Sequence, residues 1–224
     1  DLQEDVLMNP EEQLNLIIDN YMIWKSQNEY ENFAYAIMDL DFNGRLEIVS
    51  ASFGGTGRYT YSKYYEVNEE YNGLNLCESN NEDFLSGADI ITDEYPVFYD
   101  ANSNTYHYIL TDLIRISALN YVEDKRDFVL KDGRITETFL ANRETTYDEK
   151  YETHDQYTLP SGEIISEEDY INMEDKIFQN LEKKYLNIEW LDQYEYDFNN
   201  MSDEKLLMLL KKSYETYGFK KVVG

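Results

Sequence analysis

The spacing of hydrophobic residues changes twice along the chain and divides it into three regions. In residues 10–26, apolar side chains recur every three or four positions, which is typical of an amphipathic helix. Between residues 33 and 158, apolar positions mostly alternate with polar ones, as in half-buried strands. The helical period returns in residues 166–218. After a polar stub at residues 1–8, the pattern predicts a single α+β domain with an N-terminal helix, a tyrosine-rich antiparallel β-meander and a mainly helical C-terminal part.

Capping residues mark the predicted helix ends. Asn9 precedes Pro10, so the first helix has an N-cap side chain and a proline at its first position. Ser166 and the three acids after it predict a second start, because acids favour the positive N-terminal end of a helix. The last helix is expected to begin near Ser202 and to end at Gly218. The apolar side of the helix after Ser166 is expected to comprise Ile171, Ile177, Phe178, Leu181 and Tyr185.

Turn residues separate the predicted strands. Asp132-Gly133 is a strong hairpin signal, and Asn72-Gly73 predicts a tight turn within the polar, irregular residues 68–94. Residues 141–158 are predicted to form a long hairpin that continues the sheet. The predicted strands are residues 33–38, 46–53, 58–67, 95–99, 105–110, 112–122, 127–131 and 134–140.

Composition excludes several classes of partner and site. The chain has 224 residues, enough for a sizeable core, and its formal net charge of −27 disfavours nucleic acid and anionic membrane surfaces. Cys77 is the only cysteine, so neither an intramolecular disulfide nor a zinc–cysteine cluster can form. No apolar run is long enough to span a bilayer, so we expect no direct membrane insertion of this segment.

The stretch between the first two predicted strands has the composition of a cation-binding loop. Three carboxylates and one amide alternate with other residues, and Gly44 permits the sharp turn that would bring them together. The predicted ligands are the side chains of Asp39, Asp41, Asn43 and Glu47 and the carbonyl of Arg45. Five oxygens of this kind, completed by water, suit a structural Ca²⁺ bound with a Kd on the order of 10⁻⁴–10⁻³ M. The alternative is an ordinary Asn-Gly hairpin whose acids face water.

Residues 35–48, Tyr-Ala-Ile-Met-Asp-Leu-Asp-Phe-Asn-Gly-Arg-Leu-Glu-Ile, resemble a calcium-type signature of uncharacterised secreted proteins and lipoprotein ectodomains of gut Gram-positive bacteria. The stretch is also similar to the calcium loops of integrin-type surface repeats. It departs from them in carrying Asn43 where Asp is commoner and Glu47 where the integrin-type loop has Asp. The resemblance covers little more of the chain than this stretch. It implies surface location and possible calcium, with no catalytic residues.

The composition also bears on the compartment. The chain begins at Asp1 without a methionine, so we expect that an N-terminal export segment was removed. Together with the acidic, tyrosine-rich and cysteine-poor composition, this predicts an extracellular protein anchored to the surface of a Gram-positive bacterium.

Other motifs point to chemistry only weakly. The Gly-rich residues 54–57 lack the lysine ending of a phosphate-binding loop, so a turn is the better interpretation. His107 and His154 belong to no zinc or nucleophile motif, although a pair with Cys77 stays open from spacing alone. The 22 tyrosines either fill half-buried sheet positions or provide a recognition surface.

Three functions follow from these features. The first is a non-enzymatic extracellular domain with a structural Ca²⁺ loop. The second is a carbohydrate- or peptide-binding module that uses exposed tyrosines. The third is a hydrolase that uses a pair of carboxylates or His107.

Overall fold

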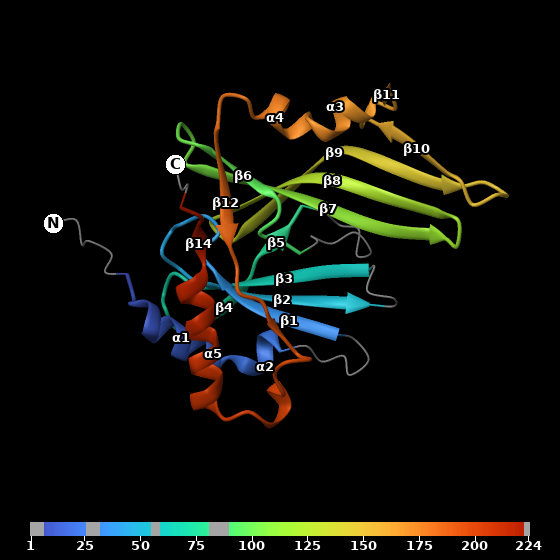
Figure 1. Cartoon of the computed structure of the whole chain (residues 1–224). Helices are drawn as coiled ribbons and strands as arrows, with labels where there is room; N and C mark the ends of the chain where they lie inside the picture. The colour runs from blue at the N-terminus through green and yellow to red at the C-terminus, as the bar shows by residue number, and fades with distance from the viewer. Residues whose placement is uncertain (1–6, 26–31, 55–58, 81–89, 222–224) are drawn as a thin grey trace.

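Two β-sheets pack against one another, and helices cover the outer face of each (Figure 1). The computed structural model of the chain describes residues 7–25, 32–54, 59–80 and 90–221. The strands are almost all antiparallel, and helices occur at both ends of the chain. The fold is therefore α+β, as the sequence pattern predicts.

The smaller sheet has five strands in the order β13-β1-β2-β3-β4. Consecutive strands β1, β2 and β3 form a meander, in which Met38 pairs with Glu47 and Glu47 pairs with Glu66. This register places Met38, Glu47 and Glu66 side by side at one end of the three strands, next to the loop that joins β1 to β2. The strands are β1 (Asn32–Met38), β2 (Glu47–Gly54), β3 (Tyr59–Val67), β4 (Leu74–Leu76) and β13 (Leu191–Asp192).

The larger sheet has the order β11-β10-β9-β8-β7-β6-β12-β14, with β5 parallel to β9. Its long strands β7, β8 and β9 extend beyond the small sheet (Figure 1). The strands are β5 (Glu78–Ser79), β6 (Pro96–Asp100), β7 (Thr105–Ser117), β8 (Asn120–Lys131), β9 (Arg134–Tyr147), β10 (Thr153–Thr158), β11 (Ile164–Ile165), β12 (Glu182–Asn187) and β14 (Gly218–Phe219).

Helices complete the two outer layers. The helices α1 (Pro10–Asp19), α2 (Tyr21–Trp24) and α5 (Asp203–Thr216) cover the small sheet, together with a 3₁₀ turn, η1 (Phe198–Asn200). The short helices α3 (Glu167–Ile171) and α4 (Met173–Ile177) pack on the large sheet. The N-caps predicted at Asn9, Ser166 and Ser202 are confirmed, because each side chain accepts a hydrogen bond from a backbone N–H three residues on.

Two apolar clusters hold the layers together. The cluster between the sheets joins Met38, Val49 and Tyr64 of the small sheet to Tyr108 and Phe128 of the large one. The cluster beneath the helices packs the apolar stripes of α1 and α5 on the opposite face of the small sheet. Its almost fully buried members include Leu14, Ile17, Trp24, Tyr35, Ile37, Ile48 and Leu210. Burial of these side chains accounts for the amphipathic pattern of the first and last helices.

Several predicted elements differ from those observed. The helix expected over residues 10–26 ends at Asp19 and is followed by the separate turn α2, because Asn20 leaves the helical conformation. The single strand expected over residues 112–122 is a hairpin, with β7 and β8 joined at Ala118 and Leu119. Neither residue is a usual turn former, so this turn has no local signal in the sequence.

The β3–β4 connection also differs from its prediction. It is a six-residue loop, Asn68 to Gly73, in which the Asn68 N–H donates to the Gly73 carbonyl at 3.0 Å and Tyr71 takes the positive φ of 51°. The Asn72-Gly73 tight turn is therefore wrong. The Gly-rich turn expected at residues 54–57 lies largely outside the described residues.

The C-terminal part contains the predicted helices and also a strand that the sequence pattern did not predict. Strand β12 lies between β6 and β14 in the large sheet, and Tyr185 belongs to this strand rather than to a helix. The helix after Ser166 is broken into α3 and α4, whose Ile171 and Ile177 are 58% and 51% exposed. Pairing with β6, a strand from a much earlier part of the chain, overrides the local helical period.

Two of the predicted hairpins are confirmed. Lys131 pairs with Arg134 across Asp132-Gly133, both of which have positive φ angles, as a two-residue hairpin turn requires. The expected long hairpin at residues 141–158 continues the sheet as β9 and β10.

In the part of the chain that the structure describes, no helix is long and apolar enough to cross a membrane.

Candidate metal centre

The loop between β1 and β2 lies where the two sheets meet. Met38 and Glu47, the residues that flank it, pair across β1 and β2, and Met38 is buried in the cluster between the sheets. From the large sheet, the Asp132 N–H of the β8–β9 turn donates to Asp41 Oδ2 at 3.0 Å. The loop therefore contacts a turn 91 residues away in sequence.

Three of the predicted ligands come together in this loop. Asp39, Asp41 and Glu47 each offer a carboxylate oxygen, and these oxygens lie within 4.8 Å of one another. Calcium–oxygen distances are about 2.3–2.6 Å, so oxygens on opposite sides of one Ca²⁺ are separated by roughly 5 Å. The cluster could therefore hold one hard cation without a change in the backbone.

Two oxygens of the cluster are buried without a partner. Glu47 is fully buried, and its Oε2 accepts a hydrogen bond from the Leu40 N–H at 2.8 Å. Asp39 Oδ2 accepts one from the Gly44 N–H at 3.1 Å. The second oxygens, Glu47 Oε1 and Asp39 Oδ1, have no hydrogen-bond partner among the described residues. Such unpaired buried acceptors are rare in folded proteins, and a cation between them would satisfy both.

The electrostatics of the cluster favour an added positive charge. Burial, followed by repulsion from Asp41, raises the pKa of Asp39 to about 6. Burial and repulsion from Asp39 raise the pKa of Glu47 well above its usual range, and burial also raises that of Glu66 on β3. Arg45 compensates only part of this charge, through an ion pair with Glu66 at 3.0 Å.

Asn43 and Arg45 have side-chain contacts of a different kind. Asn43 Nδ2 donates to Asp41 Oδ2 at 3.1 Å and to Glu66 Oε1 at 2.8 Å, while its Oδ1 accepts from the Arg45 N–H at 2.7 Å. The Arg45 guanidinium pairs with Glu66 and with Glu69. In this arrangement the Asn43 side chain orients the carboxylates of Asp41 and Glu66, and the Arg45 guanidinium lies beside Glu66 of β3.

Backbone conformation explains how the loop curls. Gly44 has φ +85°, a conformation that side chains with a Cβ resist, and an added Cβ would lie 2.9 Å from Leu7 Cδ1. Phe42 also has a positive φ, 54°, which is unusual for a bulky residue. Its ring stacks on Phe219 of β14, with centroids 5.0 Å apart, so tertiary packing stabilises the strained residue.

Sequence reasoning missed the side chains that hold the loop from outside. Gln13 of α1 is almost fully buried, donates to the Met8 and Gly44 carbonyls, and accepts from the Leu46 N–H, each at 2.8 Å. Two buried hydroxyls form hydrogen bonds with the loop backbone. Tyr108 donates to the Leu40 carbonyl at 2.5 Å, and Tyr217 donates to the Asp39 carbonyl at 3.0 Å. Their positions depend on tertiary packing, so no local sequence signal marks them.

The other candidate groups are held in different surroundings. His107 Nδ1 lies 2.9 Å from Asp127 Oδ2, and its ring packs against Phe178 at 4.9 Å between centroids. His154 lies on β10, where its Nε2 is 3.6 Å from Asp148. Cys77 is buried, and burial raises the pKa of its thiol, which leaves it a poor nucleophile.

Comparison with known proteins gives no relative. No protein-family model, no curated protein and no solved structure matches the chain.

Proposed function

We propose that this chain is a non-enzymatic extracellular domain in which the β1–β2 loop binds a structural Ca²⁺. The proposal rests on one observation: Glu47 Oε1 and Asp39 Oδ1 are buried acceptors without partners among the described residues, and they belong to a group of three carboxylates whose oxygens lie within 4.8 Å. A bound cation would satisfy both oxygens and link the three carboxylates.

Oxygen chemistry favours Ca²⁺ over softer metals. The ligands on offer are the carboxylates of Asp39, Asp41 and Glu47, and hard oxygen donors select Ca²⁺ or Mg²⁺ rather than zinc or copper. Ca²⁺ accepts six to eight ligands in irregular geometry, so the Arg45 carbonyl and water can complete its shell. Mg²⁺ requires a near-octahedral shell at shorter distances, for which a loop this constrained is less suited.

The role of the ion in this proposal is structural. Asp41 already accepts a hydrogen bond from the β8–β9 turn, so a cation held by Asp41 ties the small sheet to the large one. The net charge of −27 and the resemblance of residues 35–48 to loops of bacterial surface proteins support an extracellular location, where Ca²⁺ is abundant. Protease treatment of intact source cells tests the location: a surface protein is cleaved, whereas one protected until lysis contradicts this part of the proposal.

Calorimetric Ca²⁺ titration of the chelated protein tests the site. We expect one saturable site that Asp39→Asn and Glu47→Gln each abolish, because each removes the charge of a ligand while keeping its shape. Glu70→Gln is the matched control, since it makes the same change in net charge at an exposed position. Binding that is multi-site and equally reduced in all three variants would indicate diffuse association with an acidic protein and would refute the proposal. Mg²⁺ titrated in parallel reports selectivity.

A further inference from the structure

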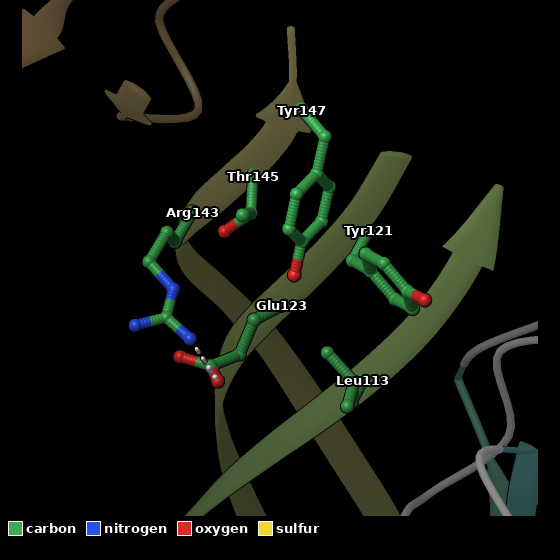
Figure 2. Close-up of a pocket in the computed structure, with 6 residues that line it drawn as sticks. All are labelled: Leu113, Tyr121, Glu123, Arg143, Thr145 and Tyr147. Carbon is green, nitrogen blue, oxygen red and sulfur yellow. Dashed lines mark hydrogen bonds and ion pairs between the residues drawn. The ribbon is translucent and has the colours of Figure 1, made fainter. Parts of the chain in front are cut away.

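A pocket of about 200 Å³ lies on the large sheet (Figure 2). Its lining does not include the β1–β2 loop, residues 39–46, which is the metal loop of the proposal. Strands β7, β8 and β9 supply its lining, and β8 runs from this pocket at Tyr121 to Lys131, next to the Asp132 N–H that donates to Asp41 of the metal loop. Ten residues of extended chain separate the two ends, a distance of roughly 30 Å. The lining residues are Leu113, Tyr121, Glu123, Arg143, Thr145 and Tyr147.

Two tyrosines form the aromatic part of the pocket. The rings of Tyr121 and Tyr147 are 6.0 Å apart and nearly perpendicular, at 73°. Figure 2 shows the hydroxyl end of Tyr147 pointing towards Glu123. Both side chains are only partly buried, so the pocket presents aromatic surface to a ligand.

The polar part of the pocket is fixed in place. Glu123 Oε2 accepts a hydrogen bond from Arg143 at 3.1 Å, and Glu123 Oε1 accepts one from the Tyr170 hydroxyl of α3 at 2.9 Å. Thr145 Oγ1 donates to Asp155 Oδ1 at 2.6 Å. These contacts set a carboxylate, a guanidinium and a hydroxyl at defined positions beside the aromatic rings, which reduces the ordering cost of binding.

Local charge narrows the class of ligand. Glu123 and Arg143 form an ion pair, and one further charge of each sign lies beside the pocket: Arg115 over the Tyr121 ring and Asp155 next to Thr145. A cationic ligand would have to compete for a carboxylate that already has two partners. An anionic ligand would meet no excess positive charge here and would be repelled by a net charge of −27.

We propose that this pocket binds a sugar residue of a neutral glycan. A pyranose ring has apolar C–H faces that pack on tyrosine, and its hydroxyls both donate and accept, as the Glu123–Arg143 pair requires. The volume of about 200 Å³ is below the usual range for drug-sized ligands and suits a single ring. An apolar ligand fits poorly, because Leu113 is the one aliphatic side chain among the described residues that line the pocket.

The test uses an array of neutral glycans ending in hexoses, N-acetylhexosamines or 6-deoxyhexoses, with sialylated and sulfated glycans as charged comparators. We expect the full chain to bind neutral glycans, and Tyr147→Ala to weaken the strongest interaction at least about tenfold. Tyr147→Phe, which keeps the ring, should weaken it less. Tyr194→Ala is the matched control, because Tyr194 is 75% exposed outside the pocket, and it should change the affinity less than about twofold.

Amide chemical shifts give a second readout that does not depend on the folding of a variant. The bound neutral glycan should shift the amide signals of Glu123, Arg143 and Thr145 in the unmodified protein, in Ca²⁺ and in chelator alike. An array without neutral hits, hits confined to charged glycans, or equal losses in Tyr147→Ala and Tyr194→Ala would each overturn the proposal. Because the pocket and the metal loop are tested by separate ligands, failure of one leaves the other standing.

Discussion

Replacement of Glu47 by glutamine should stabilise the chelated protein and remove the stabilisation that calcium gives to the unmodified protein. Glu47 is fully buried, and one of its two oxygens has no partner among the described residues. In the metal-free protein its charge repels Asp39 and Asp41, which contributes to the raised pKa of Glu47. Glutamine keeps the acceptor for the Leu40 N–H and adds an N–H₂ group that can donate to Asp39. The same change removes a charged ligand from the proposed Ca²⁺ site.

The magnitudes follow from burial and mass action. A buried charge without full compensation costs several kcal/mol, so Glu47→Gln should stabilise the chelated protein by about 1–3 kcal/mol at pH 7. For a Kd of 10⁻⁴–10⁻³ M, 10 mM Ca²⁺ stabilises the unmodified protein by roughly 1.4–2.7 kcal/mol. In a chain of this size 1 kcal/mol shifts Tm by about 2–4 °C. Calcium should therefore raise Tm of the unmodified protein by roughly 3–11 °C and leave that of Glu47→Gln almost unchanged.

Thermal unfolding in 10 mM Ca²⁺ and in chelator, at matched ionic strength, measures both effects. Glu70→Gln provides the control, because it changes the net charge equally at an exposed site and should respond to Ca²⁺ as the unmodified protein does. If Ca²⁺ raises Tm of Glu47→Gln as much as that of the control, Glu47 is no ligand. If the substitution lowers Tm in chelator, the buried charge of Glu47 does not destabilise the metal-free fold, and the argument from charge repulsion is wrong.

Three further predictions concern the same region. Asp39 has a pKa of about 6 in the folded protein and near 3.8 in the unfolded chain, so the folded state binds the proton more tightly. The free energy of unfolding of the chelated protein should therefore fall by roughly 3 kcal/mol as the pH rises between these two values. Urea unfolding at pH 4 and 7 measures this change, and a stability that rises with pH would contradict the prediction. Gln13→Leu removes three hydrogen bonds, two of them to the loop at Gly44 and Leu46 and one to Met8, and should cost about 2–4 kcal/mol by urea unfolding; a cost below about 1 kcal/mol would show that the loop keeps its conformation without Gln13. Ca²⁺ should slow hydrogen exchange at the Asp132 amide, which donates to Asp41, but not at the Lys150 amide in the β9–β10 turn; equal slowing at both would indicate a global effect.

Local chemistry made the metal loop predictable. The acids at positions 39, 41 and 47 are close in sequence, and a glycine at a position of positive φ brings them together, so their clustering requires only a tight turn. The Asp132-Gly133 hairpin was predictable for the same reason, since two residues with positive φ define it. Caps at Asn9, Ser166 and Ser202 likewise depend on hydrogen bonds within one helical turn.

Long-range pairing accounts for what the sequence did not predict. Strand β12 pairs with β6, which lies far away in the sequence, and the pattern of β12 itself indicates the continuation of a helix. Glu66 approaches the loop only because β3 pairs with β2, and Gln13 only because α1 packs beside it. Tyr108 lies in the middle of the sequence and Tyr217 near its C-terminal end, yet both donate to carbonyl groups of the loop. Such contacts are properties of the assembled fold rather than of any window of residues.

The charge in and around the metal loop is the strongest argument that a cation belongs there. Four carboxylates, those of Asp39, Asp41, Glu47 and Glu66, gather around one compensating guanidinium, and three of the four have raised pKa values. Solubility does not require this arrangement, because acids serve solubility equally well on an exposed surface. Hydrophobic residues of similar size would give a more stable core in the absence of metal. A fold that nevertheless surrounds these acids with Gln13 and two buried tyrosine hydroxyls gives up stability to place them, and the proposed divalent cation would restore it.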